Sequence, residues 1–117
     1  MDQFDVESSM SELGTVMLRV RGELEVSSAD LFVDELCQWL GIRECVVDLT
    51  GCDFVDSAGV RALVECRHQI GPDATMRVVG LSAHVERTLR RVGFDQVATL
   101  EPVSTDGASA ANSTGTA

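Results

Sequence analysis

Short strand-like runs alternate with helix-like segments through most of this chain, and this alternation restricts the fold more than any other feature. The strand-like runs cover residues 15–21, 45–49, 76–79 and 97–100. Three segments with apolar residues at helical spacing lie between them, and they cover residues 27–40, 57–70 and 82–92. This order favours a largely parallel sheet whose strands are joined by right-handed crossovers.

The length of the chain and the composition of its two ends indicate one domain. With 117 residues there is room for one hydrophobic core. Residues 1–11 are acidic and polar, and we expect either an edge strand or a loose segment there. The domain itself is expected over residues 12–101. Residues 102–117 consist mainly of Ser, Thr, Gly and Ala, which bury little, so they predict a disordered tail.

Turn and cap residues set the expected ends of the first elements. Gly22 is expected to end the first strand, and residues 27–30 fit a capping box for a helix that stops at Gly41. The run at 45–49 does not alternate, which is typical of a central strand covered on both faces or nearly so. Thr50-Gly51 is expected to end that strand.

The last helix carries clear signals at both of its ends. Ser82 is expected to cap it. Gly93 followed by Phe94 is typical of a C-terminal glycine and an anchoring apolar residue. The residues expected to face the core are Val85, Leu89 and Val92.

The segment Asp56-Ser57-Ala58-Gly59 stands where a buried strand passes into a helix. Ser57 therefore falls in or beside the first helical turn, where backbone N–H groups lack intrahelical partners. Its hydroxyl suits two roles, because it can cap the helix and it can also carry a phosphate that the helix dipole favours. From position alone, the cap is the more common role.

The charge balance excludes several classes of partner. The formal net charge is −10, and all nine basic residues are Arg. A nucleic-acid surface needs clustered positive charge, and so does a surface that docks on anionic lipid, so we expect neither. A protein partner with a basic patch is the natural complement.

The four cysteines show no metal-binding spacing and no disulfide pattern. Cys37, Cys45 and Cys66 fall in apolar elements and are expected to be buried, reduced thiols. Cys52 is expected in a loop, where it is the thiol to watch for reactivity. The sequence shows neither a signal peptide nor an apolar run long enough to cross a bilayer, which predicts a cytoplasmic protein without membrane insertion.

No constellation of residues indicates catalysis, so we expect no enzyme. His68 and His84 stand alone and are expected to face solvent, and no phosphate-loop, dinucleotide or zinc-protease motif occurs. Asp48, Asp53 and Asp56 suggest a phospho-aspartate receiver, but a receiver uses a Lys on a later strand and this chain has none. These carboxylates are better explained as hydrogen-bond acceptors that shape a turn and start the helix.

Four motifs occur in the order and spacing of one known family. They are Gly22-Glu23-Leu24-Glu25, Val46 to Gly51, Phe54 to Val60, and Leu89 to Asp95. On these motifs the chain resembles STAS domains over residues 12–100, in particular the anti-sigma factor antagonists of bacterial partner-switching systems. The resemblance implies a single α/β domain with a mixed, mostly parallel sheet of four to five strands. It also implies three to four helices packed mainly on one face.

The same resemblance implies a regulatory switch. In that family the Ser after the Asp, which is Ser57 here, is phosphorylated by a serine kinase that is also the anti-sigma factor. The unphosphorylated domain binds the kinase and frees the sigma factor, and the phosphorylated domain releases the kinase. The partner-binding residues implied for this chain are Glu23, Glu25, Asp53, Asp56, Ala58, Gly59, Val60 and Arg61. Because the kinase brings ATP and Mg²⁺, no cofactor is expected here, and a homodimer is left open.

Two positions depart from the family pattern. Many members carry a second hydroxyl where this chain has Ala58, and Glu25 stands where Asp is common. Neither change removes the phosphoacceptor, but both bear on which partner fits. The alternative function is that of STAS subunits of transport systems, which would bind a small ligand or lipid and regulate a membrane transporter.

Overall fold

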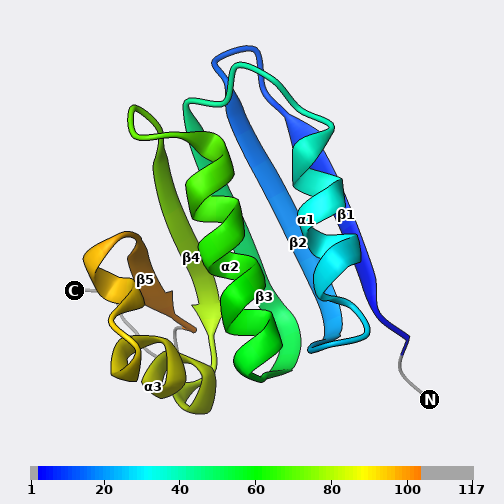
Figure 1. The fold of residues 1–117 in the computed structure, drawn as a ribbon, viewed down its shortest axis with the longest axis vertical. Coiled ribbons are helices and arrows are strands. Elements are labelled where there is room, and N and C mark those ends of the chain that lie inside the picture. The colour runs from blue at the N-terminus through cyan, green and yellow to red at the C-terminus, as the bar shows by residue number, and fades with distance from the viewer. Residues whose placement is uncertain (1–2, 104–117) are drawn as a thin grey trace.

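The computed structural model describes residues 3–103, which form one five-stranded sheet (Figure 1). The strands lie side by side in chain order: β1 (Asp5–Met10), β2 (Thr15–Leu24), β3 (Glu44–Val55), β4 (Thr75–Leu81) and β5 (Thr99–Pro102). β1 is antiparallel to β2, and all other neighbours are parallel. The largely parallel sheet predicted from the alternation is confirmed, and the N-terminal segment supplies the edge strand β1.

The helices gather on one face of the sheet. They are α1 (Ala29–Cys37), α2 (Ser57–Ile70) and α3 (Ala83–Arg91), with a short 3₁₀ turn η1 (Phe94–Gln96) before β5. In Figure 1, α1 and α2 lie in front of the sheet. Val16, Leu18 and Val20 of β2 belong to the core between sheet and helices, whereas the alternate residues Arg19 and Arg21 are exposed on the other face. The predicted arrangement of helices mainly on one face is confirmed.

β3 is the central strand, as predicted, but helices cover only one of its faces. Cys45, Val47 and Leu49 belong to the core, whereas Asp48 and Thr50 lie on the opposite, helix-free face. The prediction that both faces are covered, or nearly so, is correct for Val46, which is buried on the helix-free face, and wrong for Asp48, which is half-buried there. From β2 to β5 the strand order runs in one direction without reversal, so successive right-handed crossovers place every helix on the same side.

β2 and β3 both continue past the glycines that were expected to end them. β2 includes Gly22 and ends at Leu24, and β3 includes Gly51 and ends at Val55. The register of β2 on β3 shifts beside Gly22, whose φ of +94° only glycine adopts easily. A β-bulge accommodates such a glycine inside a strand, so the glycine alone does not mark a strand end.

α1 begins after Ser28 without the expected capping box. The Ser28 side chain makes no capping hydrogen bond to α1. Its hydroxyl instead donates to the carbonyl oxygen of Glu23 (2.7 Å) and accepts from the backbone N–H of Glu25 (3.0 Å). The serine therefore stabilises the turn before the helix, and that turn is the reason the box does not form.

α1 also ends earlier than predicted. Its last residue is Cys37, and the chain leaves the helix before Gly41. Trp39 then turns toward β1, where its indole N–H donates to the hydroxyl of Ser8 (2.9 Å). As a result Leu40, which the helical spacing assigns to the apolar stripe, is 87% exposed. A contact between distant segments has overridden the local helical pattern here.

The start and the end of α3 agree with most of the signals predicted from the sequence. Ser82 caps the helix, because its hydroxyl accepts from the backbone N–H of Val85 (3.2 Å). Gly93 adopts the left-handed region with φ +84°, and Phe94 after it is buried. Val92, which was expected to face the core, is 57% exposed because it lies beyond the last residue of α3.

The last strand lies two residues later than predicted. Val97 and Ala98 form the turn after η1, and β5 extends to Pro102. The backbone N–H of Val103 then donates to the carbonyl oxygen of Leu81 (2.8 Å). Residues 104–117, which make up most of the predicted tail, lie outside the described residues.

Candidate functional site

α2 begins at Ser57, and the residue that caps it is Asp56. The Asp56 carboxylate accepts from the backbone N–H of Gly59 (3.0 Å), and its carbonyl oxygen accepts from the N–H of Val60 (2.8 Å). Ser57 is exposed, and its hydroxyl makes no hydrogen bond within residues 3–103. The capping role open to Ser57 is thus performed by its neighbour, and the serine oxygen is left at the surface.

The start of α2 is held against the end of β2. The backbone N–H of Asp56 donates to the carbonyl oxygen of Leu24 (3.2 Å). Gly59 is buried there, and a β-carbon at its position would lie 2.2 Å from that same oxygen. Val60 is half-buried and packs against the core. Gly59 and Val60 therefore determine the position of the helix start, and this in turn determines the position of Ser57.

Four carboxylates gather where β2 and β3 end, and we refer to Glu23, Glu25, Asp53 and Asp56 as the acidic rim. Glu23 is the register partner of Phe54, so the two strands present Glu23 and Asp53 at adjacent positions. Glu25 and Asp56 follow the ends of their strands, and the Asp56 charge acts to raise the pKa of Glu25. The four acidic residues thus lie at the end of β2 and β3 from which α2 and Ser57 follow, with the side chains of Glu23 and Asp53 on the helix-free face of the sheet.

Hydrogen bonds within the turn before α1 determine the ionisation of Glu25. Its carboxylate accepts from the backbone N–H of Ser27 (3.1 Å) and from the Ser27 hydroxyl. These bonds lower the pKa of Glu25 below its ordinary value of 4.5, although burial and the nearby Asp56 oppose them. Glu25 is therefore a firmly charged member of the acidic rim at neutral pH.

A groove of about 370 Å³ lies between α1 and α2, next to the acidic rim. Ala58 and Arg61, two more of the predicted partner-binding residues, line it from α2. The other lining residues are Val26, Ala29, Asp30, Val33, Asp34, Ala62 and Glu65. The groove thus offers a partner both apolar surface and charge.

Sequence reasoning missed two apolar residues at this surface. Val26 is 77% exposed in the turn before α1, and Phe54 is 40% exposed on β3. Phe54 and Val55 are neighbours on a strand, so only one of them can face the core, and this pattern was the available signal for Phe54. No comparable pattern marks Val26. Together they add apolar area to the edge of the acidic rim.

A second hollow, of about 700 Å³, lies on the helix-free face of the sheet. Its charged lining residues are Arg19, Arg21, Glu23, Asp48 and Asp53. Asp48 accepts from the backbone N–H (2.9 Å) and the hydroxyl (2.6 Å) of Thr50, as expected for a carboxylate that shapes the chain locally. Within residues 3–103 no group of three or more metal-ligating side chains is found.

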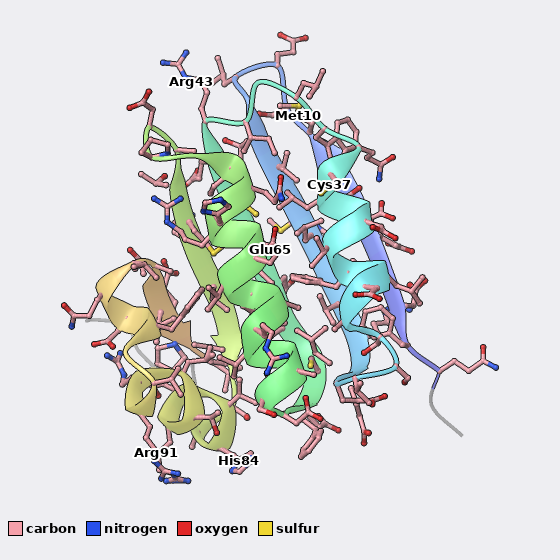
Figure 2. The ribbon with its side chains drawn as sticks, viewed as in Figure 1. Met10, Cys37, Arg43, Glu65, His84 and Arg91 are labelled. Atoms are coloured by element: carbon pink, nitrogen blue, oxygen red, sulfur yellow. The ribbon has the colours of Figure 1, made fainter. Side chains whose placement is uncertain are left out.

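The cysteine predictions are correct for Cys45 and Cys66 and wrong for the other two. Burial raises the pKa of the Cys45 thiol to about 12 and raises that of Cys66 as well. Cys52 lies inside β3 rather than in a loop; it is buried, and desolvation raises its pKa, so it is not the reactive thiol. The exposed cysteine is Cys37, at the end of α1 (Figure 2).

The remaining candidate residues are at the surface. His68 and His84 are exposed, as predicted, and Figure 2 shows His84 near the start of α3. No helix within residues 3–103 combines the length and the apolar character needed to cross a membrane.

The fold and the site define a single α/β domain that presents an exposed serine at the start of its second helix. The sequence profile of the STAS domain matches residues 9–107. The chain therefore belongs to the STAS domain family, and the resemblance that its four motifs indicated is confirmed. No curated protein matches the chain by sequence.

Solved structures show the same fold. An anti-sigma factor antagonist from Mycobacterium paratuberculosis superposes with a TM-score of 0.76 at 20% identity, with 90% of each chain covered. The anti-sigma factor antagonist SpoIIAA in its unphosphorylated form gives 0.65 at 17% identity, covering 88% of this chain and 92% of that one. A sulfate transporter family protein from Wolinella succinogenes gives 0.68 at 17% identity, with 80% of each chain covered.

Proposed function

We propose that the protein is an anti-sigma factor antagonist that works by partner switching. Unphosphorylated, it binds a kinase-type anti-sigma factor in the bacterial cytoplasm and frees a sigma factor for transcription. The observation that carries this proposal is the exposed hydroxyl of Ser57, which is free for modification because Asp56 caps α2. The structural likeness to anti-sigma factor antagonists supports it.

Phosphorylation of Ser57 ends the association in this proposal. The γ-phosphoryl group of ATP passes to the serine oxygen, ADP leaves, and the hydroxyl proton passes to a base of the kinase. The product carries close to two negative charges at a helix start, where the dipole and the backbone N–H groups favour an anion, so the fold tolerates it. Against a docked partner, the same group meets desolvation and repels any facing carboxylate. The switch therefore acts on association and leaves the fold unchanged.

The docking surface is the acidic rim together with the apolar and groove residues beside it. Val26, Phe54, Ala58 and Arg61 supply contact area, and the half-buried Val60 adds to it. Gly59 contributes through packing, because it is buried against Leu24. A rim of four carboxylates favours a partner whose facing surface is basic.

The direct test combines purified protein with the anti-sigma factor that it captures from its native cell. We expect wild type and Ser57→Ala to bind this kinase equally, and Ser57→Asp to bind more weakly. With ATP and Mg²⁺, wild type should gain about 80 Da, the mass of one HPO₃, and Ser57→Ala should gain nothing. A captured kinase that phosphorylates Ser57→Ala as well as wild type would overturn the proposal.

The second candidate function is regulation of a membrane transporter through a bound small ligand or lipid. It is favoured by the likeness to the sulfate transporter family protein and to the murine anion transporter Slc26a9, of which this chain covers only 21%. The larger hollow is lined mostly by charged and polar residues, which does not suit a lipid chain. Lipid that co-purifies with the protein, together with no labelling of Ser57 by any captured kinase, would favour this alternative.

A further inference from the structure

Arg61 lies one turn of α2 after Ser57, on the same side of the helix. Residues four apart on a helix are neighbours, with about 5–6 Å between their β-carbons. Long helical side chains lean toward the helix N-terminus, so the Arg61 guanidinium can extend over the turn that begins with Ser57. Both residues are exposed. A group attached to the serine oxygen is therefore within reach of Arg61.

Arg61 is also available to such a group. In the part of the chain that the structure describes, its guanidinium makes no salt bridge, although Asp30, Asp34 and Glu65 line the same groove. Glu65, one turn further along α2, accepts instead from the side-chain amide of Gln69 (2.7 Å), on the side away from Arg61. No strong partner has to be displaced before Arg61 turns toward Ser57.

We propose that Arg61 is an intramolecular clamp for a phosphate on Ser57, an inference that rests on the phosphorylation proposed above. A guanidinium presents paired N–H groups that match two phosphate oxygens, and both groups are charged. An acidic group four residues before a basic one is the favourable orientation on a helix. The clamp and the positive end of the helix dipole then act on the same anion.

Among the residues that line the groove between α1 and α2, Arg61 is the basic group placed for this role. The other ionisable groups that line the groove are carboxylates, Asp30 and Asp34 from α1 and Glu65 from α2, and Glu25 and Asp56 lie near the start of α2. Arg19 and Arg21 line the separate hollow on the helix-free face with Glu23 and Asp53. The carboxylates near the groove raise the pKa of a phosphate at Ser57, whereas Arg61 lowers it. The other arginine of α2 is Arg67, which donates to the carbonyl oxygen of Gly71 (3.1 Å) at the far end of the helix.

The clamp has a consequence for regulation. Arg61 is the one basic residue that lines the groove between α1 and α2. A phosphate on Ser57 draws this side chain toward the helix start, so that the docking surface loses a cation as it gains a dianion. Release of the partner thus has two causes, the cost of desolvating the phosphate at the interface and the loss of the contacts that Arg61 makes in the groove.

The test installs phosphoserine at position 57 during translation, so that it does not depend on any kinase. The second pKa of the phosphate, about 6 in ordinary surroundings, is then measured by ³¹P NMR titration. We expect Arg61→Gln to raise this pKa by about 0.3 units, equivalent to about 0.4 kcal/mol at 1.36 kcal/mol per unit. Arg61→Lys should restore part of the difference. The matched control is Arg87→Gln, because Arg87 is also an exposed arginine but lies on α3. Figure 2 shows the position of this helix by its last residue, Arg91.

Thermal unfolding of the four proteins with Ser57 or phosphoserine, and with Arg61 or Gln, supplies a second readout. The clamp predicts that Arg61→Gln lowers the Tm more in the phosphorylated form than in the unphosphorylated form. Equal losses in both forms, or an Arg87→Gln control that shifts the phosphate pKa as much as Arg61→Gln, would overturn the clamp. Failure of the phosphorylated protein to release the kinase would instead overturn the proposed function, so the two failures are distinguishable.

Discussion

The carbonyl oxygen of Leu24 lies 2.2 Å from the point where a β-carbon at position 59 would stand. The first turn of α2 is thereby packed on the backbone of β2 without an intervening side chain. The Asp56 N–H donates to the same oxygen, so one carbonyl group positions the helix start that carries Ser57. Any residue larger than glycine must push the helix away from the strand.

Gly59→Ala is therefore expected to destabilise the protein, although alanine is the better helix former. The intrinsic gain of about 1 kcal/mol is smaller than the cost of moving backbone, and we expect a net loss of about 1–3 kcal/mol. Urea unfolding followed by circular dichroism measures this change. Val64→Ala, at a position 48% exposed on the same helix, is the control and should change stability by less than about 0.5 kcal/mol. A stabilising Gly59→Ala would contradict the close approach.

Alanine substitutions of Asp56 and of Ser57 should change the unfolding free energy by different amounts. Asp56→Ala removes the oxygen that accepts from the Gly59 N–H and should cost about 1 kcal/mol of unfolding free energy. Ser57→Ala removes no hydrogen bond found within residues 3–103, so it should stay within about 0.5 kcal/mol of wild type. Asp56→Asn retains a capping oxygen and serves as the control. A larger loss of unfolding free energy in Ser57→Ala than in Asp56→Ala would mean that Ser57, and not Asp56, caps the helix.

The order of elements was predictable from sequence because each crossover helix and parallel strand has its own apolar period. The position of Ser57 at a helix start was predictable for the same reason, since it lies between a buried strand and a helical stripe. Which residue caps the helix was not predictable from spacing. Asp56 and Ser57 are both good caps, and only the extended backbone at Asp56 (φ −96°, ψ −169°) decides between them.

The errors occur where distant parts of the chain meet. β3 continues past Thr50-Gly51 because β2 pairs with it as far as Leu24 and Val55, so Cys52 is in a strand and buried. α1 ends early because the Trp39 indole N–H donates a hydrogen bond to Ser8 of β1. As a result Cys37, the last residue of the helix, is exposed. Both outcomes depend on pairing between segments, which a local period does not encode.

Cys37 should therefore be the thiol that reacts. In native protein we expect iodoacetamide to alkylate Cys37 within minutes, whereas Cys45, Cys52 and Cys66 react only after unfolding. Burial raises the pKa values of these three thiols, so the nucleophilic thiolate is scarce as well as inaccessible. Peptide mapping by mass spectrometry identifies the labelled residue, and Cys37→Ser is the control. Rapid labelling of Cys52 in the native state would contradict its burial in β3.

The Glu25 carboxyl group should titrate below its ordinary value of 4.5, because it accepts hydrogen bonds from Ser27. NMR titration of the side-chain carboxyl carbon measures this directly, and Ser27→Ala should move the pKa back upward. A lowered folded-state pKa means that the stabilisation is present above the unfolded-state pKa and is lost as the pH falls through the folded-state value. The stability difference between wild type and Ser27→Ala should accordingly shrink below about pH 4. An unchanged Glu25 titration in Ser27→Ala would contradict the turn geometry.

The acidic rim should act mainly on how fast the anti-sigma factor associates. Glu23 and Asp53 are exposed, so neutralising either one as Glu23→Gln or Asp53→Asn removes steering charge without disturbing the core. We expect each change to weaken binding about two- to fivefold at low salt, chiefly through a slower association rate, and to have less effect at 0.5 M salt, where the Debye length is only a few ångströms. Stopped-flow or surface plasmon resonance kinetics at two salt concentrations measure this. The matched control is Asp73→Asn, an exposed carboxylate in the turn after α2, away from the rim. If Asp73→Asn slows association as much as the rim variants, the partner responds to net charge alone, and the rim is not the docking surface.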